Sequence, residues 1–292
     1  MCGIIGVVGC NGKLGEILLD GIKRLEYRGY DSAGIATVNR DKIITKKDIG
    51  KIDEVDSKVN FSDFKGSIGL AHTRWATNGG VTKENAHPHN DCKDNISIVH
   101  NGIIENFSEL KEMLVKKGHK FTSSTDTEVV AHLIEDNYDE NIEEATRKAL
   151  KQIDGSYALG VICSKEPQKL IAARNESPLI VGLGNEENFI ASDVPAILKH
   201  TNKVIYLGNE EIAILENNNH LIKNIDGKSV GKEVHEIDWD ATYDYTEDVQ
   251  FGANLGWFIP GDVFLGDDSG PSSLNGNDKM ASQVIVHGNV NF

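Results

Sequence analysis

MCGIIG, residues 1–6, opens the chain, and the fold that we predict is built around this segment. Because cysteine is small, we expect the initiator methionine to be removed, which leaves Cys2 with a free α-amino group. An α-amine has a pKa of about 7.7–8.0 and can accept a proton near neutral pH. Cys2 would then hold a thiol nucleophile and its base on one residue. The alternative is an ordinary buried cysteine at the start of a strand, and the segment alone does not exclude it.

Hydrophobic patterning predicts an α+β fold. The apolar run at residues 4–8 lies between glycines and predicts a buried strand with Cys2 at its tip. Possible capping boxes pair Asn106 with Glu109 and Thr125 with Glu128. Helices are predicted over residues 15–28, 107–118, 125–134 and 143–153. Further strands are predicted over residues 32–38, 42–47, 67–73, 95–100, 157–163, 169–173, 179–181, 189–191, 203–206, 212–215 and 220–223. Runs of strands on both sides of a helical block indicate two antiparallel sheets with helices packed on them.

Composition restricts the classes of function. The 292 residues include 45 acidic and 30 basic side chains, a formal net charge of −15. We therefore expect no nucleic-acid partner, because binding the phosphate backbone needs a basic face. We find neither a signal peptide nor an apolar run long enough for a membrane helix, and we expect a cytoplasmic protein. The four cysteines lie far apart without a C-x-x-C pair, which argues against a zinc site and a disulfide framework: Cys2, Cys10, Cys92 and Cys163.

Six motifs, in order and spacing, resemble the glutaminase domain of the glutamine–fructose-6-phosphate aminotransferase family. They are CGI at residues 2–4, LEYRGYDSAG at 25–34, HTRWAT at 72–77, NAHPH at 85–89, HNGIIEN at 100–106 and STDTE at 124–128. The resemblance covers about residues 1–240 and predicts a type 2 glutamine amidotransferase. It implies the fold of N-terminal-nucleophile (Ntn) hydrolases, a four-layer αββα sandwich of two antiparallel sheets between helical layers.

The resemblance assigns a catalytic role to three residues. Cys2 would attack the side-chain amide of L-glutamine and form a γ-glutamyl thioester, releasing ammonia. Asn101 and the backbone N–H of Gly102 match the family's oxyanion hole, whose donors typically contribute about 2.7–4 kcal/mol each to catalysis. Asn-Gly is also a common hairpin turn, which is the structural alternative for these two residues.

Binding the head group of glutamine requires a partner for its α-carboxylate and one for its α-ammonium. Arg74 offers a planar guanidinium suited to the carboxylate. Asp126 resembles the family's acceptor for the ammonium group. A surface ion pair is the alternative for Arg74, and a helix N-cap is the alternative for Asp126.

The remaining predicted substrate-binding residues lie around the same motifs. Trp75, Thr77 and Asn78 belong to a glycine-containing loop that resembles the family's glutamine lid. The family usually has histidine where this chain has Asn78, so we doubt an acid–base role there. Arg28 and His87 are also expected at the pocket. We interpret the other histidines of these motifs as structural, and we expect no metal and no cofactor, because the chemistry needs neither.

We expect the glutaminase domain to comprise residues 1–239. Residues 240–292 differ in character, since two segments alternate apolar with polar or small residues and the second ends at Phe292. Such a hairpin-like tail resembles the last strands of an outer-membrane β-barrel, although an ordinary polar tail is an equal alternative. The family's sugar-isomerase domains, which bind fructose 6-phosphate, are absent from this sequence. In the full-length family a homodimer is possible.

Two other functions stay open at this point. One is an Ntn amidase or amidotransferase acting on a different amide, against which the predicted Arg74 and Asp126 pair argues. The other is a chain that binds glutamine or a partner without productive turnover.

Overall fold

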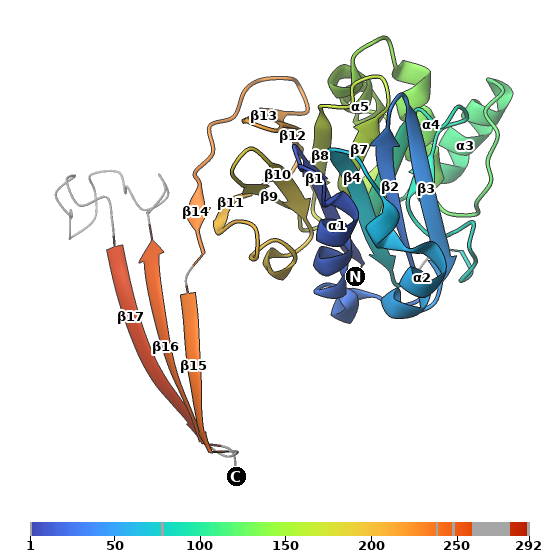
Figure 1. Ribbon diagram of the computed structural model, residues 1–292. Helices are drawn as coiled ribbons and strands as arrows, with labels where there is room; N and C mark the ends of the chain where they lie inside the picture. Colours follow the sequence, from blue (N-terminus) through green and yellow to red (C-terminus); the bar gives the residue numbers. More distant parts are fainter. Residues whose placement is uncertain (1, 77–78, 238, 247–248, 259–280, 291–292) are drawn as a thin grey trace. The chain divides into compact units, whose positions relative to one another are not determined.

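The computed structural model describes residues 2–76, 79–237, 239–246, 249–258 and 281–290 (Figure 1). The chain divides into two units. The first comprises Met1–Thr201 and Tyr206–Gly231, and the second comprises Asn202–Ile205 and Lys232–Phe292. None of the described helices is both long enough and apolar enough to cross a membrane.

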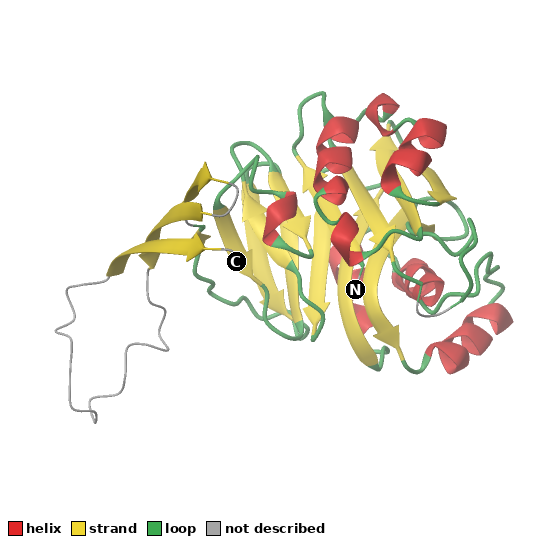
Figure 2. Ribbon diagram, turned by 90° about the horizontal axis from the view of Figure 1, so that it is seen from below, coloured by secondary structure: helices red, strands yellow, loops and turns green. Residues whose placement is uncertain are grey.

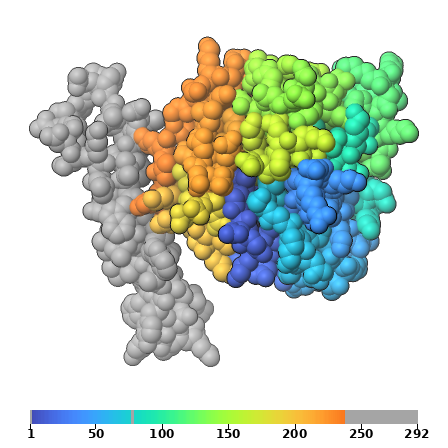
Figure 3. All heavy atoms as spheres, turned by 45° about the horizontal axis from the view of Figure 1, so that its top comes forward, coloured from blue at the N-terminus to red at the C-terminus, as the bar shows by residue number. Residues whose placement is uncertain are grey.

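The first sheet of the first unit is built around the N-terminal strand. β1 (Gly3–Val8) pairs antiparallel with β10 (Asn188–Ala191) on one side and with β4 (Ile68–Arg74) on the other. Figure 3 shows the N-terminal residues, in dark blue, between the segments coloured gold and cyan that contain these partners. Within the first unit, the strands of this sheet lie in the order β9-β10-β1-β4-β2-β3. The other strands of this sheet in the first unit are β9 (Ile180–Leu183), β2 (Ser32–Asn39) and β3 (Lys42–Ile49).

The second sheet has six strands in the order β13-β12-β8-β7-β6-β5, and each neighbouring pair is antiparallel. Its strands are β5 (His89–Asn90), β6 (Ile96–Ile104), β7 (Gly155–Cys163), β8 (Leu170–Asn175), β12 (Glu211–Glu216) and β13 (Asn219–Asn224).

Helices cover the outer faces of both sheets (Figure 2). α1 (Leu14–Lys23) and α2 (Ile52–Val59) pack on the first sheet, and the two sheets contact each other through β4 with β7 and β1 with β6. The second sheet carries the helical block, which consists of α3 (Phe107–Lys116), α4 (Thr127–Asn137) and α5 (Ile142–Leu150). Three short 3₁₀ helices are η1 (Glu26–Arg28), η2 (Phe61–Asp63) and η3 (Val194–Ala196). This is the predicted α+β sandwich of two antiparallel sheets between helical layers.

The apolar spacing of the sequence accounts for this layering. Leu14, Leu18 and Ile22 recur every fourth residue on α1, and all three are fully buried. Val130 and Leu133 of α4 belong to one core cluster with strand residues of the second sheet such as Leu159. Burying a side chain of this size contributes about 1.5–3 kcal/mol, so the helices are held mainly by the sheets they cover.

Beyond Ile237 the structure describes only the backbone of the second unit. β11 (Lys203–Tyr206) pairs antiparallel with β14 (His235–Glu236). β15 (Trp239–Thr246), β16 (Val249–Phe258) and β17 (Ala281–Val290) form a three-stranded antiparallel sheet. The sequence pattern predicts only two strands here, and the structure adds β15. The predicted domain boundary after residue 239 stays a prediction.

Local structure differs from the sequence prediction at two helix starts. Asn106 and Asp126 precede α3 and α4, and neither helix has a side-chain cap hydrogen bond. The predicted capping boxes are wrong because their side chains have partners elsewhere. Asn106 donates to the backbone oxygen of Gln152, and the Glu128 carboxylate accepts the backbone N–H of Ser123 at 2.6 Å.

Two predicted elements also end at different residues. The helix predicted over residues 15–28 ends at Lys23, because the hydrogen bonds then shorten to the i+3 pattern that forms η1. The strand predicted to end at His100 continues to Ile104, so that Asn101 and Gly102 lie inside β6. α2 is an element that the sequence analysis missed.

Candidate active site

β1 places Cys2 beside the end of β4. The register pairs Gly3 with Thr73, so Cys2 lies next to the backbone that follows Arg74. The Trp75 N–H donates to the Cys2 sulfur at 3.2 Å, and the thiol lies 3.5 Å from the Trp75 carbonyl oxygen. Burial raises the pKa of the Cys2 thiol above its ordinary value. The thiol is therefore protonated near neutral pH and needs a base before it can attack.

The segment after η1 holds the end of β4 in place. Asp31 accepts the Ala76 N–H at 2.8 Å through its carboxylate, and its own N–H donates to the Arg74 carbonyl at 2.9 Å. Gly29 packs so closely that a Cβ there would lie 2.7 Å from the backbone nitrogen of Trp75. The LEYRGYDSAG motif therefore positions the backbone that surrounds the Cys2 sulfur.

Asn101 and Gly102 lie beside Cys2 on β6. The Asn101 amide donates from Nδ2 to the Cys2 carbonyl oxygen at 2.8 Å. Gly102 has φ +133°, and a Cβ at this position would lie 2.1 Å from the Ser156 carbonyl oxygen. Only glycine fits there. Both residues pair with β7, opposite Ala158 and Tyr157, which excludes the hairpin-turn alternative.

His72 fixes the orientation of the Asn101 amide. The ring is completely buried, and burial lowers the pKa of His72 to about 3, so it is neutral at physiological pH. Its Nε2 lies 3.0 Å from Asn101 Oδ1, which is an acceptor only. His72 must therefore donate, and Nδ2 of Asn101 must face Cys2.

Arg74 and Asp126 bring opposite charges to the same cavity. Their exposed fractions are 4% and 5%. Arg74 donates from Nη1 to the Gly80 carbonyl at 3.3 Å, and Asp126 Oδ2 accepts the Ile104 N–H at 2.9 Å. Burial lowers the pKa of the Arg74 guanidinium below its usual value. Asp126 makes no N-cap hydrogen bond on α4, so the capping alternative does not hold.

These side chains surround a cavity of about 250 Å³. It is concave and combines a thiol, a guanidinium, a carboxylate and an amide. The lining residues are Cys2, Arg74, Trp75, His87, His100, Asn101, Gly102, Ile103, Thr125, Asp126, Thr127, Ser156, Ser177 and Pro178.

Comparison with known proteins agrees with this geometry. Residues 72–199 match the model of the glutamine amidotransferase domain family. The chain is 54% identical over 242 residues to glutamine–fructose-6-phosphate aminotransferase (isomerizing) of Thermococcus kodakarensis, covering 82% of this chain and 40% of that protein. The enzyme of the same name from Methanothermobacter thermautotrophicus is 53% identical over 243 residues, with coverage of 82% and 41%.

A solved structure shares the fold as well. The glutamine phosphoribosylpyrophosphate amidotransferase of B. subtilis superposes with a TM-score of 0.66 at 27% identity, covering 77% of this chain and 49% of that one. The chain contains a glutamine amidotransferase domain and has the Ntn-hydrolase fold. It spans about two fifths of the length of the curated relatives that it matches.

The structure brings together most of the residues that the sequence predicts for the amidotransferase site. Seven of the predicted residues line the cavity: Cys2, Arg74, Trp75, His87, Asn101, Gly102 and Asp126. Thr77 and Asn78 lie outside the described residues. Arg28 is not among the lining residues, and its Nη1 instead donates to Asp193 Oδ2 at 2.5 Å. This ion pair links η1 to the residue that precedes η3.

Other lining residues were missed by the sequence analysis. Thr127 follows Asp126 in the STDTE motif, and its hydroxyl lies 2.9 Å from His100 Nδ1. Ser156 lies across from Ile103 on β7, and its hydroxyl accepts the Ile103 N–H at 3.3 Å. Ser156 had no sequence signal, because its proximity depends on the pairing of two strands that are 50 residues apart.

Proposed function

We propose that the chain hydrolyses L-glutamine to glutamate and ammonia through a γ-glutamyl thioester on Cys2. The observation that carries the proposal is the cavity in which the Cys2 sulfur lies among an amide donor and two buried, oppositely charged side chains. Arg74 would bind the α-carboxylate of glutamine, and Asp126 would bind the α-ammonium. The side-chain amide would then extend toward Cys2.

In the proposed reaction the α-amine of Cys2, freed by removal of the initiator methionine, accepts the thiol proton. The sulfur forms a bond to the amide carbon, and the carbonyl oxygen becomes an oxyanion. Asn101 Nδ2 has a second N–H besides the one bonded to the Cys2 carbonyl, and this donor with the Gly102 N–H would stabilise that charge. The C–N bond then breaks, and the α-ammonium returns its proton to the departing ammonia. Water hydrolyses the thioester to glutamate and restores the thiol.

We further propose that this activity resides in residues 1–239, with L-glutamine as the small-molecule partner. In a full-length protein of this family the ammonia would aminate fructose 6-phosphate in sugar-isomerase domains, and such a protein could be a homodimer in the cytoplasm. Residues 240–292 would be an appended segment with no part in the reaction.

The test compares substrates that differ only at the head group. Release of ammonia, the product common to all three, is measured from L-glutamine, from its N-acetyl derivative and from its carboxyl-amidated derivative. The acetyl group removes the charge that Asp126 would bind, and amidation removes the charge that Arg74 would bind. A buried charge-assisted hydrogen bond is worth about 1.5–3 kcal/mol, so kcat/KM should fall at least tenfold for each derivative. Equal turnover of all three would indicate an amidase of broader specificity, and binding without turnover would indicate a non-enzymatic function.

A further inference from the structure

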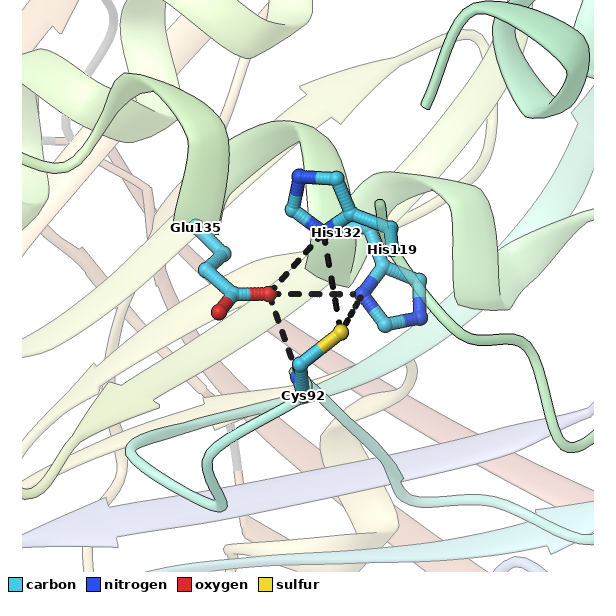
Figure 4. Close-up of side chains that lie close together, drawn as sticks. All are labelled: Cys92, His119, His132 and Glu135. Atoms are coloured by element: carbon cyan, nitrogen blue, oxygen red, sulfur yellow. Dashed lines mark hydrogen bonds and ion pairs between the residues drawn. The ribbon is translucent and has the colours of Figure 1, made fainter. Parts of the chain in front are cut away.

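Four side chains with metal-binding atoms meet on the helical side of the second sheet, apart from the glutamine cavity. Cys92 lies in the loop between β5 and β6, His119 follows α3, and His132 with Glu135 lies on α4. Figure 4 shows the thiol, the two Nδ1 atoms and the carboxylate pointing toward one another. All four atoms lie within 4.8 Å of one another.

The distances match those between the ligands of one small cation. The Cys92 sulfur lies 3.7 Å from His119 Nδ1 and 3.6 Å from His132 Nδ1. Glu135 Oε2 lies 3.1 Å and 3.5 Å from the same two nitrogens. With tetrahedral Zn²⁺ at its usual bond lengths, sulfur–nitrogen and nitrogen–oxygen separations are about 3.6 Å and about 3.3 Å. Each of the four distances is therefore close to its value in a zinc site.

The surroundings also suit metal ligands. The Lys120 N–H donates to the Cys92 sulfur at 3.4 Å, a contact that favours a thiolate. The outer ring nitrogens face carboxylates, because His119 Nε2 lies 3.8 Å from Asp136 and His132 Nε2 lies 3.7 Å from Glu128. Histidines that bind metals usually turn their second ring nitrogen to such a partner.

A route from solvent reaches the cluster. A cavity of about 650 Å³ is lined by both Cys92 and His132, together with Lys120 and Glu128. Cys92 itself is exposed, so that a cation could enter at the sulfur side.

We propose that Cys92, His119, His132 and Glu135 form a structural Zn²⁺ site. The combination of thiolate, imidazoles and carboxylate suits zinc and disfavours Mg²⁺ and Ca²⁺, which prefer oxygen ligands. The ion would connect α4 with two other segments, the loop before β6 and the segment after α3. Thr127, the first residue of α4, lines the cavity proposed to bind glutamine. The proposal departs from the sequence-based expectation of no metal, and it does not depend on the proposed function.

The experiment measures metal binding by the full chain. The chain is stripped with a chelator, separate samples are titrated with Zn²⁺ and with Co²⁺, and bound metal is counted after dialysis. We expect one Zn²⁺ per chain, a cobalt spectrum with tetrahedral intensity and a thiolate-to-cobalt charge-transfer band, and a melting temperature that rises with Zn²⁺.

Variants locate the site. Cys92→Ser and His119→Gln should each weaken Zn²⁺ binding by at least about a hundredfold, and Cys92→Ser should abolish the charge-transfer band. His220→Gln, an exposed histidine on β13, is the matched control and should bind as the parent chain does. If the parent chain binds no stoichiometric Zn²⁺, or if Cys92→Ser keeps both affinity and the cobalt band, the proposal is wrong. Because these readouts do not involve glutamine, they are independent of any glutaminase result.

Discussion

Cys2 and Cys92 occupy contrasting environments in the same unit. Among the described residues, both hydrogen bonds of the Cys2 sulfur involve the backbone of Trp75, and no side-chain base contacts it. Cys92 instead lies within 3.7 Å of two imidazole nitrogens. A sulfur without a neighbouring side-chain base suits a nucleophile that is activated by its own α-amine. A sulfur among imidazoles and a carboxylate suits a cation.

The largest effect should separate the two cysteines directly. Cys2→Ala should reduce glutamate release by at least about a thousandfold, because the bond-forming atom is lost. Cys92→Ser should release glutamate within a few fold of the parent rate, both with Zn²⁺ and without it, because Cys92 does not line the cavity that contains Cys2. Glutamate release is measured for both variants alongside circular dichroism. Retained turnover in Cys2→Ala would assign the nucleophile elsewhere.

The next effect tests the amide beside Cys2. Asn101→Ala should lower kcat by about a hundredfold or more with little change in KM, because an oxyanion donor acts mostly in the transition state. Steady-state kinetics with L-glutamine distinguishes the two parameters. A variant that lost only affinity would show that Asn101 binds substrate without stabilising the oxyanion.

The head-group residues should show a smaller loss of a different kind. Arg74→Ala and Asp126→Asn should each reduce kcat/KM for L-glutamine about tenfold or more, mainly through KM. Asp126→Asn preserves shape and removes charge, so it also serves as a control for packing around α4. Unchanged kinetics in both variants would contradict the assignment of the head group to this pair.

The smallest expected effect comes from three buried histidines and is measured as a change in the free energy of unfolding. His72 stacks on His87 with ring centroids 4.1 Å apart, and His87 contacts His89 edge-to-face with centroids 4.7 Å apart. Burial lowers the pKa of His72 to about 3, and burial is also the main cause that lowers the pKa of the other two well below 6.5. The unfolded chain binds protons below pH 6.5 that the folded chain does not.

Stability should therefore be complete above pH 6.5 and decrease as the pH falls. Each histidine contributes up to about 1.4 kcal/mol per pH unit to this decrease. Denaturant unfolding at pH 7 and pH 5 measures it, with chelator present throughout so that metal release does not contribute. A free energy of unfolding that does not vary between these pH values would contradict the burial of neutral rings.

The residues that the sequence predicts for the amidotransferase site lie in contiguous motifs, and seven of them line one cavity. Cys2, Arg74 and Asp126 each have sequence neighbours that indicate the role proposed for them. The strand context of Gly102 could not be predicted, since Asn-Gly is locally a turn signal and only pairing with β7 makes it extended. Tertiary partners likewise override the local capping signals of Asn106 and Glu128.

The Cys92 cluster illustrates the limit of sequence reasoning. Its four residues are spread over 44 residues, 92–135, without the short spacings of a zinc motif. Only His132 and Glu135 share a helical face, and such i, i+3 pairs are common on ordinary helices. The fold of α3 and α4 against the loop before β6 is what brings the four atoms together.

The most direct test of Cys2 as the activated nucleophile is mass spectrometry of the chain after treatment with a glutamine-like electrophile. We expect a chain that begins at Cys2, a single adduct on the Cys2 sulfur, and protection of that sulfur by excess L-glutamine. An adduct on Cys92 instead, or a chain that begins at Cys2 but stays unmodified, would contradict the claim that Cys2 is the activated nucleophile.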